Sequence, residues 1–155
     1  ALERAKNAGI PTEVVIKKEC GSQQLFEDRL MELLTQYAID VIVLAGFMTI
    51  LTEHFTGSYP NRILNVHPSL IPSFCGEGFY GLRVHETALK YGVKLTGATV
   101  HFVNEICDGG QIIAQKAVPV LEGDTPERLQ RRVMEQAEWI LLPQAVEQVC
   151  AEGDK

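Results

Sequence analysis

The sequence predicts an α/β fold with a mainly parallel, open sheet flanked by helices. Short apolar runs typical of strands alternate along the chain with amphipathic segments typical of helices. Residues 41–45 form a continuous apolar run followed by Gly46, as in strands buried on both faces of a parallel sheet. The chain has 155 residues, of which 46% are hydrophobic and 22% charged, enough for one globular domain with a substantial core. We therefore expect a single domain spanning residues 1–155.

The N-terminal part is predicted to be mostly helical. Residues 1–9 have the pattern of a helix end with a glycine cap. Residues 13–17 are a short strand candidate, and Ser22 can cap a helix that runs to about Tyr37. The apolar stripe of that helix consists of Leu25, Phe26, Leu30, Leu33 and Leu34.

The remaining elements alternate in type. Residues 47–55 suit a short helix or an irregular connection. The pattern then predicts a strand over residues 63–66, a helix over 84–91, and a hairpin made of 97–103 and 111–120. Thr125 as N-cap and Pro126 at the first helical position begin a last helix, which runs to about Cys150 with a kink at Pro143.

The charge balance argues against some classes of partner. The formal net charge is −6 and no run of lysine or arginine stands out, whereas nucleic acids and anionic membranes are bound by basic patches. No apolar run is long enough to span a bilayer. The four cysteines are scattered and form no C-x-x-C pair, so we expect reduced thiols in a cytoplasmic protein. The expected partners are small molecules, with no nucleic acid and no membrane.

Asn65 and His67 are the first candidate site residues. They lie two residues apart at the end of a strand, so both side chains point to the same face. Pro68 cannot donate a ladder hydrogen bond and restricts the residue before it, so the strand should end there. Ligands of open parallel sheets bind outside the carboxyl ends of strands. A lone histidine there would usually only cap the strand, but this pair predicts an active-site edge.

Asp108 is the second candidate. An aspartate followed by two glycines is by itself an ordinary turn. A catalytic histidine, however, needs a group that orients it or shares its proton, and a carboxylate is the usual partner. We therefore expect Asp108 to act with His67.

Residues 76–81 match the dinucleotide-binding pattern G-x-G-x-x-G. They begin nine residues after His67 instead of directly after a strand, and the helix that follows is short. The structural context of a dinucleotide site is therefore missing. We interpret this segment as a flexible loop beside the site.

The other reactive side chains have weaker patterns. His101 alternates with apolar neighbours, so it points either into the cavity of Asp108 or into solvent, and we favour a structural or supporting role. For His85, substrate contact and helix capping are equally supported. A nucleophilic role for Cys75 or Cys107 lacks a base. No tight cluster of metal ligands occurs, so we expect no metal.

One further region could line a cavity, whereas a second is expected to divide between surface and core. Met48, Ile50 and Leu51 follow the carboxyl end of a buried strand, where a flat, partly apolar ligand would lie. Glu138 and Trp139 lie on the last helix, where a glutamate usually faces solvent and a tryptophan usually lies in the core.

Taken together, these motifs resemble the phosphoribosylglycinamide formyltransferases of the formyltransferase superfamily. Enzymes of this family transfer the formyl group of 10-formyltetrahydrofolate to glycinamide ribonucleotide in purine biosynthesis. The resemblance covers essentially the whole chain and rests on residues 45–48, 65–72, 96–103, 108–110, 118–120 and 123–125 in this order. It implies the formyltransferase fold, one-carbon transfer, formyltetrahydrofolate as cosubstrate and no metal.

The resemblance also implies roles for individual residues. Asn65, His67 and Asp108 would be the catalytic set, and Pro68 and Glu138 would contact the nucleotide, Glu138 at the ribose hydroxyls. The folate pocket would be lined by Phe47, Met48, Ile50, Leu51, Val103, Asn104 and Asp108.

The sequence departs from the family at two places. Thr49 stands where the family commonly has arginine. The family's N-terminal strand, phosphate-binding loop and first helix have no counterpart before Ala1. We therefore expect an N-terminally incomplete domain that binds the nucleotide poorly by itself.

Three alternatives remain at this stage. Formyltetrahydrofolate hydrolase typically has histidine where Pro68 stands, and methionyl-tRNA formyltransferase typically has alanine there and carries an RNA-binding domain. Pro68 and the acidic charge favour the nucleotide substrate. A non-catalytic folate-binding fragment is the third alternative.

Overall fold

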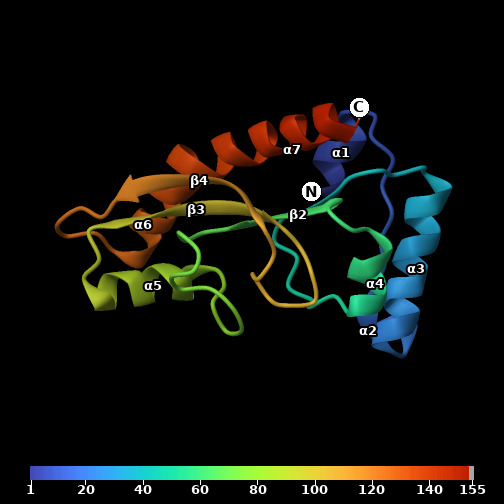
Figure 1. The fold of residues 1–155 in the computed structure, drawn as a ribbon, viewed down its shortest axis with the longest axis horizontal. Helices are drawn as coiled ribbons and strands as arrows, with labels where there is room; N and C mark the ends of the chain where they lie inside the picture. The colour runs from blue at the N-terminus through green and yellow to red at the C-terminus, as the bar shows by residue number, and fades with distance from the viewer. Residues whose placement is uncertain (154–155) are drawn as a thin grey trace. The chain divides into compact units, whose positions relative to one another are not determined.

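The computed structural model describes residues 1–153, which fall into two units: Ala1–Ile39 and the chain from Asp40 onward. The strands all belong to the second unit (Figure 1). So do all the site residues predicted from the sequence. The second unit therefore holds the candidate site.

The first unit contains helices α1 (Leu2–Asn7), α2 (Lys17–Cys20) and α3 (Gln23–Gln36). The Ser22 hydroxyl accepts a hydrogen bond from the Leu25 N–H at 3.1 Å, so the predicted N-cap of α3 is confirmed. Phe26 and Leu33 of the predicted apolar stripe are buried, but Leu25 is 58% exposed.

The strand predicted at residues 13–17 is wrong. Residues 11–16 have no regular secondary structure, and Lys17 begins α2. Val14 and Ile16 are 63% and 47% exposed. The short apolar run buries too little surface to stabilise a strand.

The second unit is built on a sheet with the strand order β1-β2-β3-β4. The strands are β1 (Ile42–Leu44), β2 (Ile63–His67), β3 (Leu95–Phe102) and β4 (Ile112–Pro119). The predicted α/β class with an open sheet and flanking helices is confirmed, but the sheet is mixed. Only β1 and β2 are parallel, whereas β2–β3 and β3–β4 are antiparallel. The prediction of a mainly parallel sheet is wrong here because β3 returns along β2 and then forms the predicted hairpin with β4.

Strand β1 is less buried than its apolar sequence predicts. It pairs with β2 alone at the edge of the sheet, and Val43 is 39% exposed. An apolar run does not distinguish a central strand from an edge strand, because both contain the same residue types.

The two faces of β2 and β3 differ in character. Register and alternation place Leu64, Ala98 and Val100 on one face, where they form the core with α6 (Pro126–Val133) and α7 (Trp139–Gly153). Figure 1 shows α7 running along β3 and β4. The opposite face carries polar side chains, namely Asn65, His67, Thr99 and His101.

The helices of this unit largely follow the sequence predictions. Helix α4 (Glu53–Ser58) follows an irregular segment after β1, and α5 (Leu82–Tyr91) ends at Gly92 in the left-handed conformation. The Thr125 hydroxyl accepts from the Arg128 N–H at 3.3 Å and caps α6, as predicted. In place of one long helix, a π-helical turn, η1 (Met134–Glu138), separates α6 from α7. Within residues 1–153, none of the helices combines the length and apolar character needed to cross a membrane.

Candidate functional site

The site begins at the carboxyl end of β2. The strand ends at His67, directly before Pro68, as the sequence predicts. Asn65 pairs in register with Leu44 of the parallel neighbour β1, so both strands end at the same edge of the sheet. Asn65 and His67 therefore project from one face at the edge where open sheets bind ligands.

The ring of His67 is held between two acceptors. Its Nε2 lies 2.8 Å from the carbonyl oxygen of Phe74, and its Nδ1 lies 3.5 Å from Oδ2 of Asp108. A carbonyl and a carboxylate can only accept, so both ring nitrogens are placed to act as donors. Because the His67 side chain is only 6% exposed, water hardly screens these contacts. The surroundings are therefore complementary to a positively charged ring.

Asp108 comes from the loop between β3 and β4, where its backbone has a positive φ of 55°. Its Oδ2 accepts a hydrogen bond from the Gly76 N–H at 2.8 Å, and its Oδ1 lies 3.6 Å from Nε2 of His101. Burial acts to raise the pKa of this carboxyl group. The contact with His101 and the hydrogen bond from Gly76, with the charges of the His67 and His101 rings when they are protonated, act against burial and hold the pKa of Asp108 below its usual value. Asp108 is thus ionised at neutral pH.

His101 connects Asp108 with Asn65. Its Nδ1 lies 2.7 Å from the Phe102 carbonyl and must donate to it. Its Nε2 lies 3.3 Å from the Asn65 amide nitrogen, from which it accepts when the ring is neutral, and 3.6 Å from Oδ1 of Asp108, toward which it donates when the ring is protonated. A register shift between β3 and β4 occurs at Val100/His101, and such bulges re-aim side chains. Of the two orientations expected for His101, the one toward Asp108 is found, and the ring is buried.

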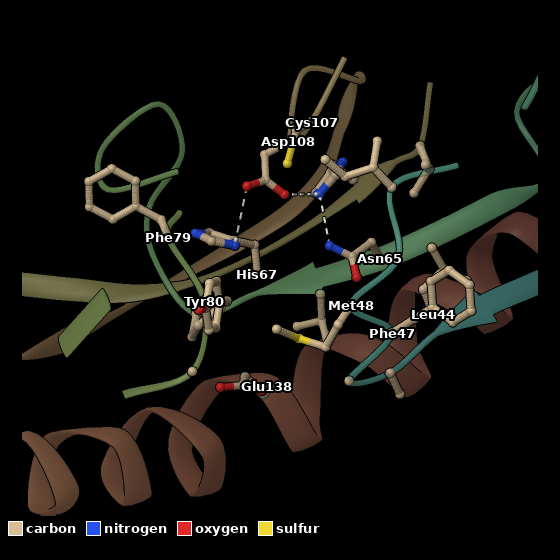
Figure 2. A pocket seen from close by; sticks show the side chains of 18 of the residues that line it. Leu44, Phe47, Met48, Asn65, His67, Phe79, Tyr80, Cys107, Asp108 and Glu138 are labelled. Atoms are coloured by element: carbon tan, nitrogen blue, oxygen red, sulfur yellow. Dashed lines mark hydrogen bonds and ion pairs between the residues drawn. The ribbon is translucent and has the colours of Figure 1, made fainter. Parts of the chain in front are cut away.

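These residues line an open cavity of about 1080 Å³. Figure 2 shows Asn65, His67 and Asp108 gathered together, with Glu138 on the helix across from them. Every site residue predicted from the sequence lines this cavity: Phe47, Met48, Ile50, Leu51, Asn65, His67, Pro68, Val103, Asn104, Asp108 and Glu138. The structure therefore brings together side chains from β2, both flanking loops and the end of η1.

Several lining residues were not predicted. Trp139 was expected in the core but is 61% exposed and lines the cavity beside Glu138. Tyr80 is 54% exposed and lines the cavity with the rest of the 76–81 loop, so this loop lies beside the site as expected. Large exposed aromatic side chains are a signal of binding, but helical periodicity alone does not reveal that Trp139 is exposed.

Glu138 and Thr49 also face the cavity. Glu138 is half-buried, and burial raises the pKa of its carboxyl group. Its carboxyl oxygens can accept hydrogen bonds from a ligand in the cavity. Thr49 contributes a hydroxyl without a charge to the cavity wall.

The remaining candidates take other places. His85 is fully buried in α5 and does not line the cavity, so neither capping nor substrate contact is found. Burial, followed by the charge of His67, lowers the pKa of His85 to about 4. Burial and then Asp108 raise the pKa values of the Cys75 and Cys107 thiols, which disfavours the thiolate form. Across residues 1–153, no three or more His, Cys, Asp or Glu residues are grouped so as to hold a metal ion.

Comparison with known proteins defines the class. The family model described as "Formyl transferase" matches residues 1–146, and the chain belongs to this family. The chain is 41% identical over 154 residues to the chloroplastic phosphoribosylglycinamide formyltransferase of Arabidopsis thaliana, covering 99% of this chain and 52% of that protein. It is 42% identical over 135 residues to the phosphoribosylglycinamide formyltransferase of Escherichia coli K12, covering 87% and 61% of the two chains.

The fold agrees with that of solved relatives. The crystal structure of glycinamide ribonucleotide transformylase 1 from Symbiobacterium toebii has a TM-score of 0.86 and 43% identity, covering 94% of this chain and 66% of that chain. The chain thus spans about half to two thirds of the length of these relatives.

Proposed function

We propose that the protein transfers the formyl group of 10-formyltetrahydrofolate to the amine of glycinamide ribonucleotide, with Asn65, His67 and Asp108 as its catalytic residues. The names of the relatives support formyl transfer to the nucleotide. The observation that carries the proposal is the setting of His67, which has an acceptor at each ring nitrogen and the Asn65 amide on the same strand face. A buried donor pair of this kind suits the negative charge that develops in acyl transfer.

The reaction begins when the amine nitrogen attacks the formyl carbon. A new C–N bond forms and the formyl oxygen takes up negative charge. The Asn65 amide donates one N–H toward His101 and has a second N–H for this oxygen. The contact from Nδ1 of His67 to Asp108, at 3.5 Å, is longer than a normal hydrogen bond, so its proton can also be shared with the oxygen. In other acyl-transfer enzymes, loss of one such donor costs about 10²- to 10³-fold in turnover.

Proton transfer completes the reaction. The attacking amine loses one proton, and the folate nitrogen gains one as its bond to the formyl carbon breaks, so the overall reaction is balanced. Asp108 is ionised and lies beside His67, so it can accept the amine proton, directly or through water, and return it to the leaving nitrogen. The chemistry needs neither a metal nor a covalent enzyme intermediate.

The two substrates are assigned to different parts of the cavity. The apolar side chains of Phe47, Met48, Ile50 and Leu51 suit the flat pteridine ring of the folate, with Val103 and Asn104 on the facing loop. Glu138 suits the ribose hydroxyls, because its carboxyl oxygens can accept hydrogen bonds from them. Pro68 follows His67 and lines the cavity, and it would contact the nucleotide.

The proposal is tested by supplying both substrates to the protein and following the folate product by absorbance and the nucleotide product by mass. We expect formyl-folate to be consumed only when the amine substrate is present. The rate of this consumption should be lower in Asn65→Ala. Formate release without the amine would indicate a hydrolase instead. Folate binding without turnover would indicate a binding module, and either result would overturn the proposal.

We also propose that residues 1–155 act as one formyltransferase domain. The family match supports this, because it runs across the boundary between the two compact units at Ile39 and Asp40. A single cooperative transition is expected in calorimetry. Two separate transitions would contradict a single domain.

A further inference from the structure

The loop that follows β2, residues 68–76, contacts both members of the proposed acid–base pair through its backbone. The Phe74 carbonyl lies 2.8 Å from Nε2 of His67, and the Gly76 N–H donates to Oδ2 of Asp108 at 2.8 Å. Neither contact depends on a side chain of the loop. The orientation of His67 and the charge state of Asp108 therefore depend on where the loop backbone is held.

The Thr99 hydroxyl holds this loop. It donates to the Ser69 carbonyl at 2.7 Å, and it accepts from the Ile71 N–H at 3.1 Å and from Nε2 of Gln115 at 2.9 Å. A hydroxyl has one hydrogen and two lone pairs, so its capacity is fully used. Thr99 is completely buried, and a buried group with all its partners in place is costly to disrupt.

Gln115 of β4 completes the attachment. Its Nε2 also donates to the Ile71 carbonyl at 3.0 Å, so one amide nitrogen binds both Thr99 and the loop. Both backbone polar groups of Ile71 are therefore fixed by these two side chains. Within the loop, the Ser69 hydroxyl donates to the Ser73 carbonyl at 2.5 Å, next to Phe74.

Strand register explains why these residues meet. His67 pairs with Thr99, and Thr99 pairs with Gln115, so the three side chains form one row across β2, β3 and β4 on the same face. The loop crosses this row and contacts each member. Neither Thr99 nor Gln115 lines the cavity, so neither is expected to touch a substrate.

We propose that Thr99 and Gln115 are positioning residues. They hold the backbone of the 68–76 loop, and that backbone in turn positions His67 and Asp108. The expected effect on catalysis rests on the proposed function. The structural connection from Thr99 through the loop to Gly76 and Asp108 does not depend on that function. Asp108 is the reporter, because the Gly76 N–H is one of the groups that lower the pKa of its carboxyl group. The other groups that face it are His67 from β2, His101 from β3, and the thiols of Cys75 and Cys107.

The test compares Thr99→Val, which keeps the shape of the side chain but removes the hydroxyl, with Thr99→Ser, which keeps the hydroxyl. Gln115→Met removes the amide at an exposed position and gives the same readouts if Thr99→Val does not fold. Gln144→Met, an equal change at an exposed position outside the cavity, is the control.

Two readouts do not depend on activity. In Thr99→Val and Gln115→Met, hydrogen exchange at the Gly76 N–H should become at least about tenfold faster, because the loop opens more easily. The pKa of Asp108, followed by carboxyl-carbon NMR, should rise toward its usual value, because a hydrogen bond to the charged form weakens. Thr99→Ser and the control should behave as the original protein.

The third readout is formyl transfer. A small misplacement of reacting groups can cost about 100-fold, so kcat should fall by about 10- to 100-fold while KM for either substrate changes little. The proposal is overturned if folded Thr99→Val or Gln115→Met leaves Gly76 exchange and Asp108 titration unchanged, or if Thr99→Ser is as impaired as Thr99→Val. If the original protein shows no formyl transfer, the proposed function fails, while exchange and titration still decide the link.

Discussion

Replacing Asp108 with asparagine removes a charge from the proposed centre while keeping the shape of the side chain. The Asp108 carboxylate lies 3.5 Å from Nδ1 of His67, and both side chains are less than a tenth exposed, at 9% and 6%. With an effective dielectric constant of about 20, a unit charge pair at this distance is worth about 5 kcal/mol. This is an upper value for the interaction energy that the charged His67 ring loses, and it is equivalent to roughly three to four powers of ten in an equilibrium constant.

We therefore expect Asp108→Asn to lower kcat by about 10²- to 10⁴-fold, the range typical of lost acid–base catalysis. The pH–rate profile should also change, because the carboxylate 3.5 Å from His67 no longer takes part in proton transfer. The assay is a pH series of formyl transfer under saturating substrates, with Asp40→Asn, at a side chain that is 88% exposed, as the matched control. An unchanged pH–rate profile in Asp108→Asn would refute the coupling between Asp108 and His67.

Three further predictions concern other residues. His67→Ala should reduce turnover by several powers of ten while folate affinity, measured by calorimetry, stays within a few fold, because the ring acts mainly on the developing oxyanion; unchanged turnover would contradict its role. Trp139 is the single tryptophan and lines the cavity, so a bound folate should quench the intrinsic fluorescence, and a signal unaffected by saturating folate would place the ligand elsewhere. Asp124→Asn should cost about 1–2 kcal/mol at pH 7, because the hydrogen bond from Arg132 holds the pKa of Asp124 at about 2, below its usual 3.8. Since folding lowers this pKa, the stabilisation by Asp124 is complete above pH 4 and is lost as the pH falls toward 2. The melting temperatures of the original protein and of Asp124→Asn should therefore converge near pH 2. A difference in melting temperature that does not change with pH would exclude this linkage.

Much of the candidate site follows from local sequence. The spacing of Asn65 and His67 sets their common face, because alternate residues of a strand point the same way. Pro68 ends the strand, because it cannot donate to the sheet. The turn that contains Asp108 is likewise local, since two glycines follow it between strand-forming segments. These features depend on residues close in sequence, so they could be predicted without a fold.

Other features depend on contacts between distant segments. The strand-forming pattern at residues 97–103 does not state whether β3 runs parallel or antiparallel to β2, and the sheet proved to be mixed. Trp139 directly follows the π-helical turn η1 and lines the cavity, which helical periodicity alone does not reveal. His101 could have faced solvent until its register with Asn65 fixed its side of the sheet.

The sequence by itself determined the elements, the family resemblance and the identity of the reactive side chains. Only the tertiary structure decided that His101 completes the contacts of Asp108, and that Thr99 and Gln115 hold the loop beside His67. The reason is that periodicity reports which face of an element is buried, whereas strand register is set by pairing across the sheet. A shift of one residue in that register would pair side chains from opposite faces, so His67, Thr99 and Gln115 would no longer form one row on the same face.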